Sequence, residues 1–504
     1  MSEAFPGMPP PPPVAATRPA SVVVLYRRTP QGVEVFWVKR EKALAFAGGF
    51  YAFPGGKVDK ADAAVPVRGA SGEEAALRGA AARELFEEAG VLVAEGSERL
   101  GAEEVRELRR ALLEKRLAWE ELLRRHGLAL RAEDFPAAGR WVTPEFAPVR
   151  FDTFFYLVEA PAHAQAEWWP GELSEAAWVK PAEALARWEQ GTALLHPPAL
   201  HVLRVMADFD STQGALARLR EQPHCPDFIA QRIEFQRGAR VFPLRTATLP
   251  PATHTNAYVL GTGELLLVDP GADDEAEVAR LLALVEGLVA EGMKPQAVLL
   301  THHHEDHVGG ARRVKERLGI PLWCHARTAD RLDGPVDRLL EDGEVLELAG
   351  TPPQRWRVLH TPGHTRGHLC LVDERTGAAV VGDMVASVGT IVIDPPEGDM
   401  AEYLTQLARL RDWPVTTLYP SHGTAIPDGP GKLQEYLDHR EAREARILEA
   451  VPAEGATLTE VVGRAYMETP PFLYPVAERS ALAVLLKLAR EGRVREAAGR
   501  YYPA

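Results

Sequence analysis

The stretch Thr301-His-His-His-Glu-Asp-His307 decides the fold of the second half of this 504-residue chain. It contains the pattern His-x-His-x-Asp-His, formed by His302, His304, Asp306 and His307. Neutral imidazoles and carboxylates bind divalent transition metals, and four such groups so close together cannot all reach one tetrahedral ion with good geometry. The stretch therefore predicts a loop that serves two neighbouring metal ions and needs further ligands downstream.

Three further groups of the right chemistry follow this loop. His364, Asp383 and His422 each come just after a short apolar run that is typical of a strand. Because strand ends are rigid and meet at one edge of a sheet, we expect all these groups to converge. The expected strands, including the one before the first loop, are Gln296–Leu300, Arg357–Leu359, Ala378–Val381 and Thr416–Leu418.

We expect this set of side chains to hold two zinc ions. Asp383 is expected to bridge them, because both oxygens of a carboxylate can coordinate. The remaining ligands divide between the ions, with His302, His304 and His364 on the first and Asp306, His307 and His422 on the second.

The order and spacing of these groups resemble the metallo-β-lactamase superfamily over about residues 240 to 446. The first strands and the first motif of that family are matched by Thr253-His-Thr-Asn-Ala-Tyr-Val259 and Leu267-Val-Asp-Pro-Gly271. The resemblance implies an αββα sandwich and hydrolysis by a water activated between two cations about 3.5–4 Å apart. It also implies that Asp269 orients a metal ligand and that Asp306 acts in catalysis by orienting the attacking water.

Members of this superfamily cleave lactams, thioesters, lactones, RNA and DNA, so the fold and the metal site do not name the substrate. One more histidine belongs to this region, because His368 follows His364 by four residues. It is expected either to orient a ligand or contact the substrate, or to be an ordinary loop histidine.

The stretch Arg83-Glu-Leu-Phe-Glu-Glu-Ala-Gly-Val91 indicates a second site in the first half of the chain. On a helix Glu84, Glu87 and Glu88 share one face, where like charges repel unless water or a cation neutralises them. Oxygen-only clusters favour Mg²⁺ or Mn²⁺, and these ions in turn bind diphosphates. A solvated helix face with Glu/Arg pairs is the alternative explanation.

This string, preceded by the turn at Gly55 and Gly56, resembles the Nudix box, and the resemblance extends over about residues 20 to 220. It implies an α/β/α sandwich in which Arg83 and the two glycines support the metal-binding glutamates. Glu87 or Glu88 would act as the base for water that attacks a diphosphate.

Two details of the first half refine this resemblance. The family pattern has a glutamate eight residues before the arginine, where this chain has Ala75, so a non-catalytic nucleotide sensor is the alternative function. The extended segment after Phe53-Pro-Gly-Gly56 is similar to that of peroxisomal-type coenzyme A diphosphatases, so we expect a nucleotide or CoA-type diphosphate as substrate. The charged segment Glu103–Arg125 is expected either to cap the site or to be a solvated helix.

The tail after the last metal ligand has a winged-helix pattern. Two helices are expected over Leu458–Tyr466 and Ala481–Glu491, followed by a hairpin that ends near Tyr502. With the preceding Asp438-His-Arg440, this layout resembles the metallo-β-lactamase subgroup that includes the mitochondrial single-strand endoribonuclease. The resemblance makes single-stranded RNA a candidate partner.

Charge qualifies that interpretation. Arg493 and Arg495 alternate on the expected wing strand and are the best candidates for phosphate contacts. The whole chain, however, has a net charge of −14, which is not that of a basic nucleic-acid binder. A glyoxalase II-like thioesterase or lactonase is therefore the alternative function of the second domain.

Composition indicates a multidomain globular protein. Its 504 residues exceed one hydrophobic core, and no apolar run approaches the ~18 residues of a membrane span. Five consecutive prolines at residues 9–13 predict a disordered tail. The widely spaced Cys225, Cys324 and Cys370 favour a reducing compartment, so we expect a cytoplasmic location without a membrane partner.

We predict a multidomain chain of α/β and α+β folds that is a bifunctional metal-dependent hydrolase. A Nudix α/β/α sandwich with Mg²⁺ or Mn²⁺ would hydrolyse a diphosphate, and an αββα sandwich with two Zn²⁺ and a winged helix would cleave an RNA phosphodiester. The predicted parts are a disordered tail at 1–18, a Nudix domain at 19–225, a linker at 226–239, a metallo-β-lactamase domain at 240–448 and a winged-helix domain at 449–504.

Overall fold

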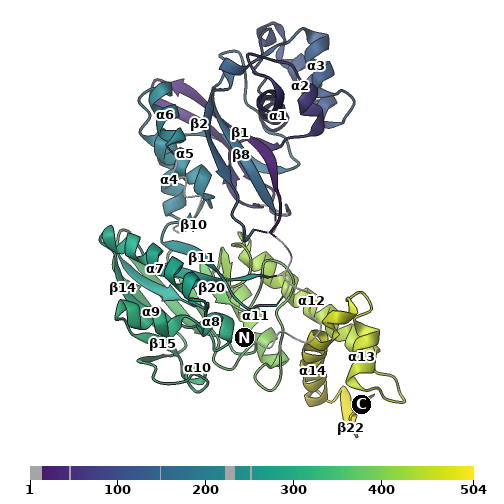
Figure 1. Ribbon diagram of the computed structural model, residues 1–504. Helices are drawn as coiled ribbons and strands as arrows, with labels where there is room; N and C mark the ends of the chain where they lie inside the picture. The colour runs from purple at the N-terminus through teal and green to yellow at the C-terminus, as the bar shows by residue number, and fades with distance from the viewer. Residues whose placement is uncertain (1–13, 45–46, 148, 222–232, 250–251) are drawn as a thin grey trace. The chain divides into compact units, whose positions relative to one another are not determined.

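The structure is a computed structural model that describes residues 14–44, 47–147, 149–221, 233–249 and 252–504. The described chain divides into two compact units, one that precedes the gap at 222–232 and one that runs from Arg237 to Ala504. Figure 1 colours both by residue number. None of the helices in the described part is both long enough and apolar enough to cross a bilayer.

The N-terminal unit is a mixed sheet with helices on both faces, the α/β/α arrangement that the sequence predicts. The sheet has the order β3-β2-β1-β8-β7, with β4 on β1 and β9 on β2. Its strands are β1 (Thr17–Thr29), β2 (Gly32–Arg40), β3 (Tyr51–Ala52), β4 (Gly55–Lys57), β7 (Ala137–Val142), β8 (Arg150–Glu159) and β9 (Leu173–Val179), and β5 (Val67–Arg68) pairs with β6 (Leu130–Arg131) apart from it. Its helices are α1 (Gly72–Ala89), α2 (Ala102–Leu113), α3 (Trp119–His126), α4 (Pro181–Glu189), α5 (Pro197–Ala207) and α6 (Thr212–Arg220).

The alternation of side chains along β1 explains why both faces are covered. Val23 and Leu25 pack on the side of α1, whereas Val24 and Tyr26 pack on the side of α4, α5 and α6 (Figure 1). Helix α1 ends at Gly90, whose left-handed φ of 69° suits a glycine. The sheet thus holds α1, and with it the three predicted glutamates, in a fixed place.

Two predicted segments lie next to strands of the structure. Residues 1–13 of the predicted tail lie outside the described residues, but Thr17 and Arg18 already belong to β1, because they pair with Arg150 and Phe151 of β8. The predicted linker lies outside the described residues as far as residue 232. Its remainder contains β10 (Ile233–Gln236), whose four residues are all buried and therefore pack instead of crossing solvent.

The C-terminal unit contains two larger sheets. In the first, β11, β12 and β13 are antiparallel, and β14, β15 and β16 continue in parallel; in the second, β17 to β20 are antiparallel and β21 is parallel to β20. The strands are β11 (Ala239–Arg245), β12 (His254–Leu260), β13 (Glu264–Val268), β14 (Lys294–Leu299), β15 (Leu322–His325), β16 (Arg338–Leu340), β17 (Val345–Leu348), β18 (Gln354–His360), β19 (Leu369–Asp373), β20 (Ala379–Gly382) and β21 (Leu418–Pro420).

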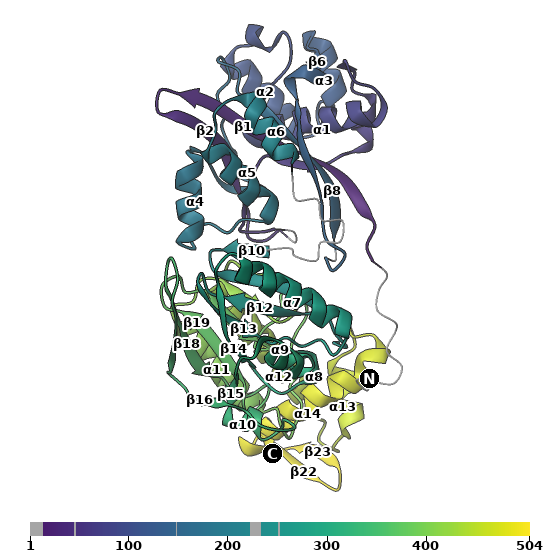
Figure 2. The same cartoon turned by 60° about the vertical axis from the view of Figure 1, so that its left-hand side comes forward.

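Each sheet has its own helical cover, which gives the predicted αββα fold. Buried side chains of α7 and α9 share a core with β11 to β15, and those of α11 and α12 share another with β18 to β21 (Figure 2). The sheets meet at the metal-ligand loops, where Leu369 N donates to Thr301 O and Asn256 N donates to Ser421 O. The helices are α7 (Glu275–Ala290), α8 (Glu305–Val308), α9 (Ala311–Leu318), α10 (Ala326–Ala329), α11 (Met400–Asp412) and α12 (Gly429–Glu449).

The last residues form the predicted winged helix, with α13 (Leu458–Ala465), α14 (Tyr474–Arg490) and the hairpin of β22 (Val494–Ala497) and β23 (Arg500–Pro503). A capping box of Thr457 and Glu460 starts α13. Helix α14 begins seven residues before the predicted Ala481, because a proline in its first turn is compatible with a helix start. The core of α13 and α14 is continuous with that of α11 and α12.

Candidate functional site

The predicted zinc ligands converge where the strands of the two sheets end. Among the described residues, the groups of three or more His, Cys, Asp or Glu side chains whose ligand atoms lie within 4.8 Å all belong to this cluster. Those groups are His302, His304, His364 and Asp383; Asp306, His307 and His422; and Asp269, His302 and His307.

Spacing in the first group suits one metal ion. His304 Nδ1 lies 3.1 Å from His302 Nε2 and 3.0 Å from His364 Nε2, and Asp383 Oδ2 lies 3.5 Å from His364 Nε2. Ligand atoms bound to one tetrahedral zinc at 2.0–2.1 Å lie about 3.4 Å from one another. The three separations are thus close to those expected around one zinc ion.

Spacing in the second group is similar. Asp306 Oδ2 lies 3.7 Å from His307 Nε2 and 3.6 Å from His422 Nε2. Asp383 Oδ1 lies 3.6 Å and 3.4 Å from the same two nitrogens. One oxygen of Asp383 therefore faces each group, which is the arrangement of a bridging carboxylate.

Two orphaned atoms show that these residues fit a metal ion. His307 Nε2 and Asp383 Oδ1 are buried and make no hydrogen bond to any described residue. A buried polar atom without a partner is costly, and a cation between the two would satisfy both. The donor set, nitrogen-rich with two carboxylates, is one that zinc and related transition metals accept.

The opposite ring nitrogen of three proposed ligands is held by a neighbour. His307 Nδ1 lies 2.9 Å from Asp269 Oδ2, His364 Nδ1 donates to Val392 O at 2.9 Å, and His422 Nδ1 donates to His254 O at 3.2 Å. Such contacts fix the orientation and the tautomer of a metal-binding imidazole.

Asp269 therefore lies in the place that the sequence resemblance implies. It also accepts hydrogen bonds from Thr301 N and Thr301 Oγ1, at 2.7 Å and 2.5 Å. Gly271 follows closely, and a Cβ there would come within 1.7 Å of the carbonyl oxygen of Asp306. This glycine allows the motif to pass directly beneath the metal-ligand loop.

Electrostatics divides the imidazoles into two classes. Burial and neighbouring imidazoles lower the pKa of His302 well below its usual value and that of His364 to about 3, so both rings are neutral at neutral pH. Burial also acts to lower the pKa of His307, but Asp306 and Asp383 outweigh it and raise the value to about 10. The carboxylates of the second group thus stabilise a positive charge at the place where a cation would bind.

Two of the N-terminal glutamates contact one buried arginine. Arg83 donates to Glu84 Oε1 at 2.8 Å and to Glu87 Oε2 at 3.1 Å, and it binds both oxygens of Asp62 at 2.8 and 2.9 Å. Burial raises the pKa of Glu84 to about 7. Burial, with the nearby Glu84, raises the pKa of Glu88 to about 8. The cluster has more negative charge than Arg83 neutralises well, which favours a cation.

Steric crowding explains why glycines stand at the two predicted positions, 55 and 56. A Cβ on Gly56 would meet Glu84 Oε1 at 2.5 Å, and one on Gly55 would meet Ser21 O at 2.4 Å. Gly55 N also donates to the buried Glu88 Oε2 at 2.9 Å. The turn thus places backbone directly against the helix of glutamates, although these do not converge on one point as the histidines do.

Two residues of this site were missed by the sequence reasoning. Asp62, in the extended segment, is 1% exposed and orients Arg83. Arg109 of α2 donates to the carbonyls of Glu87, Glu88 and Glu167 and stacks on Trp169. The charged segment is therefore docked on the C-terminal end of α1 by a buried side chain, so a purely solvated helix does not describe it.

Comparison with known proteins identifies the second half. Residues 250–422 match the family described as Metallo-beta-lactamase superfamily. The beta-lactamase-like protein 2 homolog of Drosophila melanogaster is 33% identical over 252 residues, which are 48% of this chain and 84% of that protein. The chain belongs to the metallo-beta-lactamase superfamily. It is a metal-dependent hydrolase with a histidine and aspartate cluster that can bind metal.

Other similar proteins match parts of this chain. Residues 457–500 match the beta-lactamase associated winged helix domain. The lactamase-like protein adaB of Aspergillus niger is 33% identical over 42% of this chain, and the match covers only 62% of the length of adaB. The atrochrysone carboxyl ACP thioesterase of Aspergillus chevalieri is 31% identical over 48% of this chain and 77% of its own.

Two solved structures resemble the two units. A metallo-beta-lactamase family protein from Thermus thermophilus has 26% identity and a TM-score of 0.45, over 53% of this chain and 99% of its own. A NUDIX hydrolase from Alicyclobacillus acidocaldarius has 29% identity and a TM-score of 0.37, over 41% of this chain and 99% of its own.

His368 has a defined place in this metallo-beta-lactamase site. Its Nε2 accepts the backbone N–H of Asp383 at 3.0 Å, so its Nδ1 must carry the proton, which faces Thr361 Oγ1 at 2.8 Å. The ring is completely buried, so a direct substrate contact does not fit. His368 holds the backbone of the proposed bridging ligand.

Replacement of His368 by leucine tests this arrangement. We expect zinc affinity to fall about 10–100-fold, as is typical when an outer partner of a ligand is lost. The buried Asp383 N–H would also lose its acceptor, which lowers the melting temperature. Chelator competition and thermal unfolding measure the two effects. Thr361→Val, which leaves the Nε2 acceptor in place, should reduce zinc affinity less; an equal loss would contradict the proposed role.

The two wing arginines are engaged within the protein. Arg493 pairs with Glu444 of α12 at 2.6 Å, and the Arg495 guanidinium lies 4.3 Å from the ring centre of Tyr502. Lys487 pairs with Glu444 and Glu491 at 2.7 Å each. Carboxylates thus balance the charges of Arg493 and Lys487, whereas Arg495 keeps its charge beside an aromatic ring.

Proposed function

We propose that the C-terminal unit hydrolyses acyl thioesters with two metal ions. The observation that carries the dinuclear site is Asp383, whose two oxygens face two separate donor groups. Bound zinc ions supply Lewis acidity and a nucleophilic water at neutral pH. The proposed ligands are His302, His304 and His364 on one ion, and Asp306, His307 and His422 on the other, with Asp383 shared.

Asp306 is the residue we propose to orient the attacking water. Its Oδ2 accepts a hydrogen bond from Thr255 Oγ1 at 3.0 Å, which fixes the carboxylate. Its side chain is 17% exposed, whereas the ring of His307 is fully buried. Asp306 is thus held firmly and can still meet solvent, as a group that positions water must.

Two observations favour a thioester over RNA. A relative of 31% identity is named as an acyl carrier protein thioesterase. The wing residues Arg493 and Lys487 are paired with Glu444, and the chain is acidic overall. An RNA phosphodiester, the substrate first expected from the winged helix, remains the second candidate because residues 457–500 match such a domain.

A substrate panel decides between them. The full-length protein with Zn²⁺ is assayed with an acyl-CoA, a lactone and a single-stranded RNA, with thiol release, acid release and gel electrophoresis as readouts. We expect turnover of the thioester and none of the RNA. RNA cleavage that Asp306→Ala abolishes would replace the thioester proposal.

For the N-terminal unit we propose Nudix-type hydrolysis of a nucleotide or CoA-type diphosphate with Mg²⁺ or Mn²⁺. Glu84, Glu87 and Glu88 would hold the ion, and Glu87, with a side chain 23% exposed, is the best placed to meet substrate. Asp62 supports the proposal because it orients Arg83, although Ala75 stands at the usual glutamate position. A nucleotide sensor would bind the same ligand without turnover.

The two proposals share a chemical logic. An acyl-CoA contains both a thioester and a diphosphate, so one chain could cleave both bonds of the same compound class. The domain limits of 19–225, 240–448 and 449–504, and a cytoplasmic location, remain predictions. The absence of diphosphate turnover with free coenzyme A would remove this link without affecting the thioester proposal.

Removal of metal gives a prediction that does not depend on the substrate. A ligand that binds only the folded state at about 1000 times its Kd stabilises it by about 4 kcal/mol. For a domain of this size that is a melting shift of roughly 8–16 °C. We expect chelation to lower the unfolding temperature of the C-terminal unit by this amount in calorimetry, and added Zn²⁺ to restore it. An unchanged transition would contradict the metal site.

A further inference from the structure

The loop from Met384 to Asp394, here called the 384–394 loop, links the metal site to the helices of the C-terminal tail. It begins directly after Asp383, the proposed bridging ligand. Near its other end, the carbonyl of Val392 accepts the hydrogen bond of His364 Nδ1 at 2.9 Å. A movement of this loop would therefore turn the ring of a proposed ligand.

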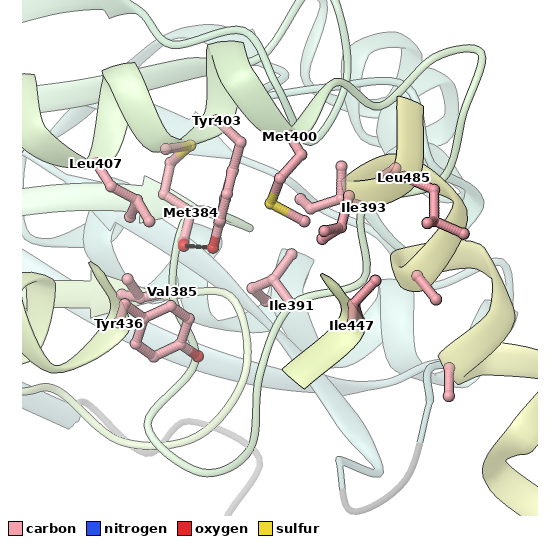
Figure 3. Packing of buried hydrophobic residues seen from close by; sticks show 14 of the residues in the cluster. Met384, Val385, Ile391, Ile393, Met400, Tyr403, Leu407, Tyr436, Ile447 and Leu485 are labelled. Carbon is pink, nitrogen blue, oxygen red and sulfur yellow. Dashed lines mark hydrogen bonds between the residues drawn. The ribbon is translucent and has the colours of Figure 1, made fainter. Parts of the chain in front are cut away.

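Two tyrosines hold the first half of the loop. Tyr403 of α11 donates to Met384 O at 2.6 Å, the dashed contact in Figure 3. Tyr436 of α12 accepts from Ala386 N at 2.8 Å and lies 2.9 Å from Gly389 O, to which it donates. Both rings are almost fully buried, so these contacts belong to the core.

The residues on either side of Val392 are held by different helices. Arg440 of α12 donates to Ile391 O, and Ser480 of α14 accepts from Ile393 N at 3.4 Å. The side chains of Ile391 and Ile393 belong to the core that α12 and α14 build with Ile447 and Leu485 (Figure 3). The winged helix thus contributes directly to the position of the Val392 carbonyl.

Arg440 brings a buried charge to this loop. Arg440 is 6% exposed, and its guanidinium lies 5.3 Å from the ring centre of Tyr403. A buried charge requires close partners, and the Ile391 carbonyl and the Tyr403 ring supply them here. Arg443, three residues later, makes the same kinds of contact elsewhere, to Ala465 O and over the ring of Tyr466 at 4.1 Å.

We infer that α12 and the winged helix form a positioning module for the metal site, with Arg440 and Ser480 as its positioning residues. They fix the 384–394 loop, the loop fixes the Val392 carbonyl, and the carbonyl fixes His364. The inference rests on the proposed function in one respect, that His364 is a ligand of the first metal ion. It gives the winged helix a role that needs no nucleic acid.

The pair Arg440→Met and Arg443→Met tests the inference in the full-length protein. Both variants keep an apolar stem and lose one guanidinium on the same helix, which is buried in Arg440 and partly buried in Arg443, where it also pairs with Glu468. We expect the affinity for one of the two Zn²⁺ ions, measured by competition with a chromogenic chelator, to fall about tenfold for Arg440→Met. Arg443→Met should stay within about twofold of the parent. Arg440→Lys, which can still donate to Ile391 O, should recover part of the loss.

Ser480→Ala is the milder second variant. It removes only the acceptor of Ile393 N, and we expect about threefold weaker binding of the same ion. Unfolding of the metal-free proteins, followed by circular dichroism, shows whether each variant is folded. If Arg440→Met does not fold, the comparison of Ser480→Ala with the parent decides.

The outcomes separate this inference from the proposed function. Unchanged zinc affinity in Arg440→Met and Ser480→Ala, or an equal loss in Arg443→Met, would overturn the positioning role while leaving the metal site in place. A parent protein that binds no Zn²⁺ would instead overturn the proposed function. Selective loss in Arg440→Met with partial recovery in Arg440→Lys supports the inference.

Discussion

Replacement of Asp383 by asparagine is expected to lower the turnover of the C-terminal unit by at least about 10³-fold, equivalent to about 4 kcal/mol of transition-state stabilisation. The variant keeps the shape of the side chain but loses the charge that faces both donor groups. Because one oxygen faces each group, the zinc content should fall from two ions to one or none. Metal analysis of the purified variant and initial rates with an acyl-CoA measure the two effects.

The N-terminal unit supplies the control for this variant. Asp383→Asn should leave diphosphate hydrolysis with Mg²⁺ unchanged, because Asp383 is not part of the glutamate cluster. Two zinc ions retained with full thioester turnover would show that Asp383 does not bridge. A loss of both activities would indicate a folding defect instead.

The double variant Glu87→Gln and Glu88→Gln is expected to reduce diphosphate hydrolysis by about 10²–10⁴-fold, the usual loss when a catalytic base is removed. The amides keep the volume of the carboxylates but cannot accept a proton or neutralise a cation. Gly55 N can still donate to the amide oxygen at position 88, so the fold should persist. Phosphate-bond cleavage in free coenzyme A, followed by chromatography, is the measurement.

Ligand binding separates the enzyme from the sensor. If the parent binds the diphosphate without cleaving it, and the double variant binds it equally well, the sensor function replaces hydrolysis. A matched substitution on the same helix, Glu73→Gln, should leave diphosphate turnover unchanged, because Glu73 lies in the first turn of α1, far along the helix from the cluster. Loss of activity in Glu73→Gln would show a general effect of lost charge on α1.

The histidine cluster was predictable because metal ligands come from few residue types and follow the ends of strands. His302, Asp383 and His422 can be recognised in the sequence because their own side chains would bind the metal. Asp269, which holds His307, can likewise be recognised from its own motif. Val392 and His254 cannot, since they act through backbone carbonyls. Only the folded chain shows which carbonyl lies beside which ring.

Distant pairing explains the remaining differences. Asp62 lies 21 residues before Arg83, and nothing in the local pattern marks the pair. The alternation of Arg493 with Arg495 predicts a phosphate contact, and it does not show that Glu444, 49 residues earlier, lies beside Arg493. Charges read along a sequence count as free until the fold supplies their partners.

The contact of Arg109 with the end of α1 limits how this protein can be shortened. Three carbonyl oxygens, those of Glu87, Glu88 and Glu167, take their donors from that single guanidinium. A shorter chain from which residues 103–125 were excised would leave these acceptors without their donor, two of them in the last turn of α1. Any such trimming, by evolution or by an engineer, must bring in a substitute donor, or α1 is expected to fray from that end.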